Sequence, residues 1–186
     1  MIETFLLICT VLFVLAELFT IYDAAKNKKY ARIIQNVILI GIAIFLIVFN
    51  QKFQYSIYPF ILIFFMITLI GHTVFGQSLN FYHRSKIFDR YLHCFGAFTF
   101  SLLFYSILQN IWGPIEGGKG YMALLIAAIG ITLGTLFEIL EFIIDTASKS
   151  PKPLKHQHGL ADTDMDLISN TLGAILAGIL SIYLFI

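Results

Sequence analysis

The chain has 186 residues, of which 59% are hydrophobic and 12% are charged, and its formal net charge is +1. A soluble domain of ordinary composition carries about 25% charged residues, and one small core cannot bury this much apolar surface. The composition therefore predicts an integral membrane protein, and the near-neutral charge gives no reason to expect a nucleic-acid partner.

Six segments reach the length of roughly 18–20 apolar residues that a helix needs to cross a bilayer. The first does not resemble a cleavable signal peptide, because Glu3 stands where a basic n-region is expected. No linker or change of composition divides the chain, so we expect one integral-membrane domain over residues 1–186, an all-α bundle of six transmembrane helices. The expected spans are residues 5–22, 33–50, 57–75, 91–112, 121–144 and 164–186, with a long polar loop over residues 76–90.

The basic residues predict how these spans are oriented. Lysine and arginine accumulate in cytoplasmic loops. The loops after the second and fourth spans hold only Lys52 and Lys119, so both termini should face outward. The loops after the first, third and fifth spans hold the other ten, which are Lys26, Lys28, Lys29, Arg32, Arg84, Lys86, Arg90, Lys149, Lys152 and Lys155.

Polar side chains recur at helical spacing near the predicted cytoplasmic ends of the last three spans. A charge inside a bilayer costs several kcal/mol unless it is paired, hydrated or turned toward the bundle interior. Small residues continue the same faces and would let neighbouring helices approach closely. We therefore expect the three faces to pack against one another, and Glu17 and His72 to lie near them. The faces carry Asp89, His93 and Gly96, then Glu138, Glu141, Gly130 and Gly134, then Asp162, Asp166, Asn170 and Gly173.

Carboxylates together with imidazole suit a divalent cation, which is the cofactor that we consider for this site. The candidate catalytic residues are His93, Glu138, Glu141 and Asp166, and Asp162 joins them as a candidate metal ligand. Without a metal, one carboxylate would hold a proton because its neighbour is charged, and would serve as a general acid or a proton relay. The structural alternative is that acids such as Asp162 and Asp164 only cap a helix, and that His156 and His158 are loop residues.

Three motifs in the C-terminal half resemble those of a known family. FDRYLHCFG (Phe88–Gly96), FEILEF (Phe137–Phe142) and DTDMDLISNTLGA (Asp162–Ala174) are similar in order and spacing to the YjdF-like family of bacterial inner-membrane proteins, and more distantly to VanZ-like proteins. The resemblance implies a small multi-pass protein of the bacterial inner or plasma membrane. YjdF-like proteins have no assigned reaction, and VanZ-like proteins are associated with teicoplanin resistance. The shared positions are Asp89, Arg90, His93, Glu138, Glu141, Asp162, Asp166 and Asn170.

Three classes of function remain open from the sequence. The first is an enzyme acting on a lipid or lipid-linked headgroup from the cytoplasmic leaflet, with Arg90, Asn170 and Lys155 binding the substrate and the loop lysines attracting its phosphate. The second is a proton- or ion-coupled carrier, because intramembrane carboxylates are common in such pathways. The third is a membrane scaffold or regulatory protein in which the polar cluster holds the bundle together or binds a partner.

Overall fold

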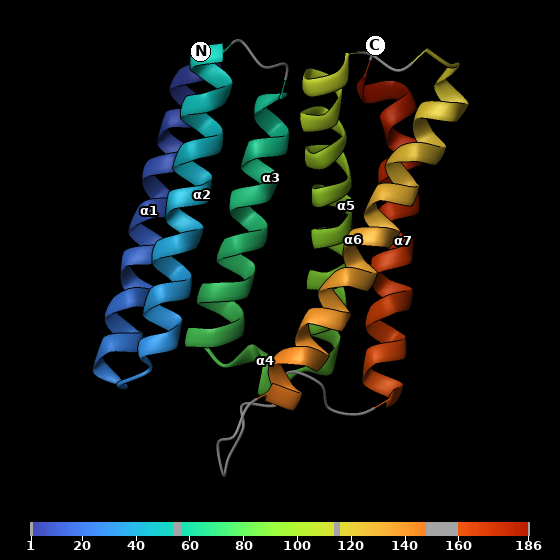
Figure 1. Cartoon of the computed structure of the whole chain (residues 1–186). Coiled ribbons are helices and arrows are strands. Elements are labelled where there is room, and N and C mark those ends of the chain that lie inside the picture. The colour runs from blue at the N-terminus through green and yellow to red at the C-terminus, as the bar shows by residue number, and fades with distance from the viewer. Residues whose placement is uncertain (1, 54–56, 114–115, 148–159, 186) are drawn as a thin grey trace. The chain divides into compact units, whose positions relative to one another are not determined.

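The structure is a computed structural model, and it describes residues 2–53, 57–113, 116–147 and 160–185. Within these ranges every regular element is a helix and there is no strand (Figure 1). The elements are α1 (Ile2–Lys26), α2 (Tyr30–Phe53), α3 (Pro59–Ile70), the π-helix η1 (Gly71–Ser78), α4 (Phe81–Arg84), α5 (Lys86–Trp112), α6 (Lys119–Ala147) and α7 (Leu160–Leu184).

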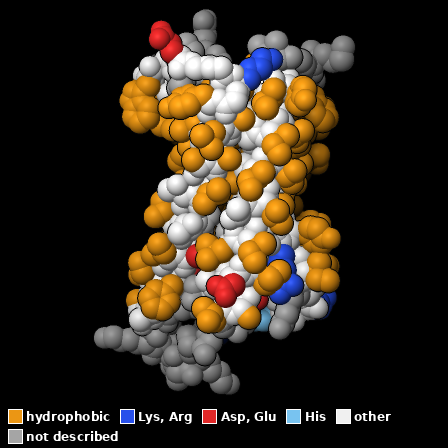
Figure 2. All heavy atoms as spheres, turned by 90° about the vertical axis from the view of Figure 1, so that its right-hand side faces the viewer, with side chains coloured by type: hydrophobic (Ala, Val, Ile, Leu, Met, Phe, Trp, Pro, Cys, Tyr) orange, Lys and Arg blue, Asp and Glu red, His pale blue; other side chains and the backbone are white. Residues whose placement is uncertain are grey.

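Six helical stretches have the length and the apolar composition needed to cross a membrane. Large hydrophobic side chains are exposed along them, and Figure 2 shows a face on which such side chains cover most of the length. Exposed apolar surface of this extent is typical of a helix whose solvent is lipid. The predicted all-α polytopic fold is therefore confirmed. The stretches are Thr4–Lys26, Tyr30–Gln51, Pro59–Ser78, Ile87–Trp112, Lys119–Ile144 and Leu160–Leu184.

The stretch after the third span differs from the sequence prediction. The expected polar loop over residues 76–90 is largely helical, because η1 extends to Ser78, α4 follows, and α5 already begins at Lys86. Asn80 turns the chain with a left-handed φ of 62°, a conformation that asparagine tolerates better than most residues. Ser85 then caps α5, since its side chain accepts a hydrogen bond of 3.2 Å from the Phe88 N–H. The polar residues of this segment thus led to the prediction of a loop, where the structure has a turn at Asn80 and the start of α5.

The last helix also begins earlier than predicted. α7 starts at Leu160 and not at residue 164, so Asp162 lies in its first turn and Asp164 lies inside the helix. Neither Asp162 nor Asp164 is therefore the N-cap residue of α7, which was the structural alternative for both. An acidic side chain in a first turn is favoured by the helix dipole, which explains the position of Asp162.

The contacts divide the chain into two compact units. The first contains α1, α2, α3, η1, α4 and both ends of α5, up to Leu92 and again over Ser106–Gly113. The second contains the middle of α5, His93–Tyr105, together with α6 and α7. The boundary after Leu92 falls within one continuous helix, so residues on either side of it keep helical spacing. A single domain over the whole chain stays a prediction.

In the first unit, α1 packs against α2, α3 and η1. Its core includes Phe13 on α1 and Ile61 and Leu62 on α3, all of which are almost fully buried. Polar side chains are buried beside this core as well, on α1, α2 and η1. The first unit therefore contains buried polar groups in addition to its apolar core.

In the second unit, glycines allow three helices to approach closely. A Cβ atom on Gly173 of α7 would overlap the backbone oxygen of Cys94 on α5, and one on Gly178 would lie 2.5 Å from the backbone oxygen of Ala123 on α6. A Cβ atom on Gly130 of α6 would overlap the Ser101 hydroxyl of α5. Small residues at such contacts are the usual means by which helices pack tightly in a membrane. The polar residues on these faces are consequently held inside the unit.

Candidate functional site

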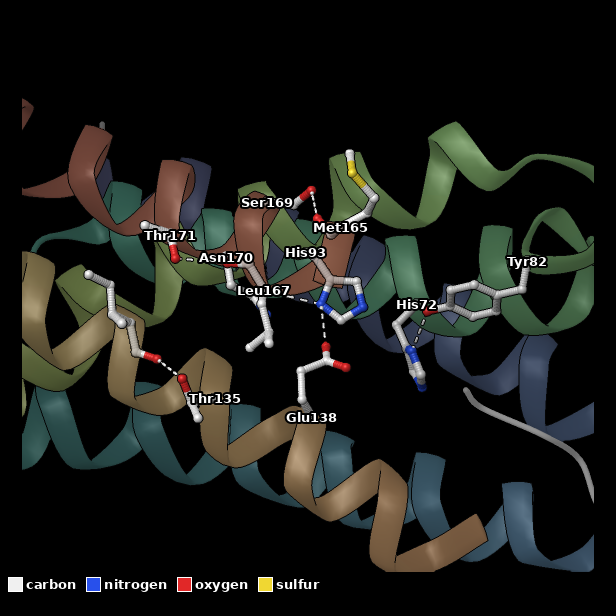
Figure 3. A network of polar contacts seen from close by, with 11 residues as sticks. His72, Tyr82, His93, Thr135, Glu138, Met165, Leu167, Ser169, Asn170 and Thr171 are labelled. Atoms are coloured by element: carbon white, nitrogen blue, oxygen red, sulfur yellow. Dashed lines mark hydrogen bonds and ion pairs between the residues drawn. The ribbon is translucent and has the colours of Figure 1, made fainter. Parts of the chain in front are cut away.

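The candidate site is centred on His93, where α5 enters the second unit. The His93 side chain is 10% exposed, and its Nδ1 lies 3.5 Å from Glu138 Oε1 of α6. The same Nδ1 lies 3.3 Å from Asn170 Oδ1 of α7, so one imidazole joins all three helices of the unit (Figure 3). With an oxygen of Glu138 and an oxygen of Asn170 close to it, Nδ1 is placed to donate in the tautomer that leaves the lone pair on Nε2. Metal ligation and base catalysis both use such a lone pair.

The residues that surround His93 are deeply buried. Glu138, Asp166 and Asn170 are each only 4% exposed. On α7, Asp166, Asn170 and Gly173 follow one another at intervals of four and three residues, and all three are buried. A Cβ atom on Gly134 of α6 would lie 2.6 Å from the Asn170 Cβ, so this glycine makes room for Asn170 next to His93. The helical faces predicted from spacing do turn inward in the second unit.

Two further carboxylates lie close to the His93 ring. Asp166 of α7 and Asp89, one helical turn before His93 on α5, each place an oxygen within 4.8 Å of a ring nitrogen. Asp89 and Asp166 thus join His93 in a group that could hold a metal ion, whereas Glu138 Oε1 lies 3.5 Å from Nδ1. Histidines that ligate metals commonly donate their other ring N–H to a carboxylate or a carbonyl oxygen, which is the position of Glu138 and Asn170.

The remaining predicted site residues lie at the edge of this group or outside the described residues. Glu141 of α6, Asp162 of α7 and Arg90 of α5 are half-buried. The Arg90 Nε is buried and has no hydrogen-bond partner among the described residues. Lys155, His156 and His158 lie outside the described residues.

The sequence associated Glu17 and His72 with the same site, but the two residues bond to two other sets of residues in the first unit, one around Glu17 and one around His72. The Glu17 carboxylate accepts hydrogen bonds from threonines, and His72 contacts glutamines and a tyrosine (Figure 3 shows the last of these). The sequence singled out Thr20 beside Glu17, but it missed the other neutral members of these two sets, because isolated threonines, glutamines and asparagines are common in loops and helices. The missed residues are Gln35, Asn36, Thr73, Gln77 and Tyr82.

A family model described as a predicted membrane protein, DUF2238, matches residues 5–185, which is nearly the whole chain. The chain belongs to the DUF2238 family of predicted membrane proteins. The match includes the first three predicted spans, to which the sequence motifs did not extend. The family match agrees with the YjdF-like resemblance and with a multi-pass membrane protein. A similarity to VanZ-like proteins is not shown by the comparisons.

One relative is an uncharacterized protein of Thermotoga maritima, with 37% identity over 105 residues. The match covers 55% of this chain and 51% of that protein, so the chain accounts for about half the length of its relative. No solved structure matches the chain.

Proposed function

We propose that His93 and Asp166 of the second unit, with Asp89 one turn before His93 on the same helix, bind a divalent cation and carry out acid–base chemistry on a lipid or lipid-linked headgroup that enters from the cytoplasmic leaflet. The observation that carries the proposal is the position of His93. Its Nδ1 faces Glu138 and Asn170, which favours the tautomer with the lone pair on Nε2, and Asp89 and Asp166 each offer an oxygen within 4.8 Å of a ring nitrogen. Aligned imidazoles with fixed tautomers are characteristic of metal and acid–base sites.

The residues divide into two roles. His93 and Asp166 would bind the cation directly, with Asp89 as the third ligand, since each offers an atom at suitable separation. Glu138 and Asn170 would orient the His93 ring. Glu141 and Asp162, which the sequence also offers as ligands, are half-buried. Two aspartates and one imidazole suit Mn²⁺ or Zn²⁺ better than Mg²⁺, which prefers oxygen ligands.

A lipid substrate fits the surroundings of this site. The helices that carry the residues expose long apolar faces, as expected where acyl chains lie against protein. Arg90 follows Asp89 on α5, and its buried Nε has no partner among the described residues, so a phosphate could take that place. When bound, a divalent cation would polarise a phosphoryl oxygen and help to generate a nucleophile from water.

Elemental analysis of the purified full-length protein tests the metal directly. We expect near-stoichiometric divalent metal in the wild type and its loss in the double variant Glu138→Gln/Asp166→Asn. The matched control is Asp164→Asn, which removes the same charge from an exposed position of α7 and should leave the metal content unchanged. Circular dichroism confirms that each variant is folded.

Activity is then measured by release of headgroups from labelled phospholipids in detergent micelles, with and without a chelator. Turnover that needs the metal and fails in the double variant supports the proposal. Wild-type protein that contains no metal, binds none on addition of Mn²⁺ or Zn²⁺, and releases no headgroup would show that the proposal is wrong.

A further inference from the structure

A second buried polar group lies in the first unit, and it surrounds an acid. Glu17 of α1 is fully buried, at 0% exposed, and Thr20, Asn36 and Thr73 are at most 1% exposed. The Thr73 Oγ1 lies 2.7 Å from Glu17 Oε1, and the Thr20 Oγ1 lies 3.3 Å from Glu17 Oε2. The Asn36 Nδ2 in turn lies 2.5 Å from the Thr20 Oγ1. Residues of α1, α2 and η1 thus meet around one carboxylate.

The group has more acceptor oxygens than donor protons. The Thr20 hydroxyl also lies 2.8 Å from the backbone oxygen of Glu17, and the Thr73 hydroxyl lies 2.9 Å from the backbone oxygen of Leu69. Each hydroxyl has one proton, so two protons face four oxygen acceptors. When a threonine hydroxyl donates its proton to the backbone oxygen, the hydroxyl oxygen and the Glu17 carboxylate oxygen face each other with no proton between them. A positive charge beside these two oxygens would relieve their repulsion.

The charge of Glu17 is not balanced by a neighbouring side chain. Among the described residues, its carboxylate contacts only the two threonines. Of the titratable groups on the elements packed against α1, Arg32 on α2 donates to the backbone oxygen of Gln77. The His72 Nε2 on η1 accepts from amide nitrogens of Gln35 and Gln77, and α3 has no titratable residue. A bare buried carboxylate is costly in a membrane.

Asn36 provides an independent sign that a ligand is missing from the hydrogen-bond pattern. Its Oδ1 is buried and has no hydrogen-bond partner among the described residues. This oxygen belongs to the same side-chain amide as the Nδ2 that contacts Thr20. Thr73 belongs to a π-helix, a rare conformation that is frequent at functional sites.

We propose that Glu17, Thr20, Asn36 and Thr73 form a binding site for a dehydrated monovalent cation, with Na⁺ as the probe. Their oxygens are of the type that hard cations prefer. One carboxylate among neutral oxygens balances a single positive charge, whereas a divalent ion would leave a buried excess of charge. The cation would neutralise Glu17 and give the Asn36 oxygen a partner.

The test measures thermal unfolding of the detergent-purified full-length protein as Na⁺ replaces choline at constant ionic strength. We expect a saturable rise in Tm of roughly 5–10 °C at a hundredfold excess over the dissociation constant. Glu17→Gln keeps the shape of the side chain and should abolish the response, and Thr73→Val should weaken it. Thr10→Val is the matched control, because the Thr10 hydroxyl bonds only the Leu6 backbone oxygen of its own helix.

Equilibrium binding of radioactive Na⁺ to the wild type provides a second readout that does not depend on how the variants fold. Saturable binding at one ion per chain supports the site. If Na⁺ and choline give the same Tm and no Na⁺ binds, while Glu17→Gln is as stable as the wild type, then Glu17 carries a proton and the proposal is wrong. Neither result depends on the divalent metal of the second unit.

Discussion

Replacement of Gly173 by alanine tests whether the close approach of α7 to α5 holds the second unit together. The added Cβ atom would overlap the Cys94 backbone oxygen and lie 2.8 Å from the Cys94 carbonyl carbon. Backbone atoms inside a helix cannot move aside as a flexible side chain can, so the two helices must separate. Overpacking of this kind costs about 1–3 kcal/mol of unfolding free energy.

Gly173→Ala also raises the helix propensity of α7, and the same substitution at a second glycine, where nothing clashes, measures that contribution separately. Glycine to alanine in a helix gains about 1 kcal/mol where nothing clashes. Gly41 of α2 is the control, because a Cβ atom there would meet nothing within 4 Å. We therefore expect Gly173→Ala to be less stable than Gly41→Ala by about 1–3 kcal/mol, which is the cost of the clash alone.

Reversible unfolding in mixed micelles of a mild detergent and dodecyl sulfate, followed by circular dichroism, measures both variants. Metal content provides a functional readout, since Asn170 precedes Gly173 by one turn on the same buried face and should shift with α7. Equal unfolding free energies for the two variants would refute the close contact between α7 and α5, and with it the geometry assigned to His93.

Three further changes follow from the structure. Gly134→Ala should push Asn170 away from His93 and lower metal affinity about 10–100-fold, as measured by equilibrium dialysis with the folded variant. Ser85→Ala removes the hydrogen bond to the Phe88 N–H and should cost about 1 kcal/mol of stability in the same micelle assay. Asn36→Asp adds a second carboxylate to the first unit, and the Na⁺ effect on Tm should give way to one of Ca²⁺; an unchanged preference for Na⁺ would count against the charge balance proposed there.

The transmembrane fold could be predicted from the sequence because lipid requires long apolar helices, and apolar length is visible in composition alone. The errors fell at helix ends. Gly76 and Ser78 were expected in a loop, yet they belong to η1, and the last span was expected to begin at Asp164 although α7 begins at Leu160. Helix ends depend on individual caps such as Ser85, and polar residues favour an end without fixing it.

The candidate site was predictable to the level of helical faces. Intervals of three and four residues placed Glu138 and Asn170 on buried faces, and the structure brings both to His93. Spacing could not decide which acid reaches which ring nitrogen, because that depends on the rotation of neighbouring helices. Glu138 as a ligand stays a prediction, and the three groups whose potential ligand atoms lie within 4.8 Å of one another are Asp89, His93 and Asp166.

The group around Glu17 escaped prediction for a different reason. Apart from Thr20, its other members are neutral residues on other helices, and no spacing rule connects Asn36 with Thr73. Only the structure shows that they are buried around the same carboxylate.

Charge balance connects the two proposals and separates their ligands. In a medium that cannot solvate ions, a site is most stable when bound charge and protein charge cancel. Asp89 and Asp166 together carry two negative charges when ionised, and their group matches a divalent ion. Glu17 alone carries one, and its neutral partners add none, so its group matches a monovalent ion. The two sites should consequently be loaded independently: a chelator would remove the metal of the second unit and leave the Na⁺ dependence of Tm in place.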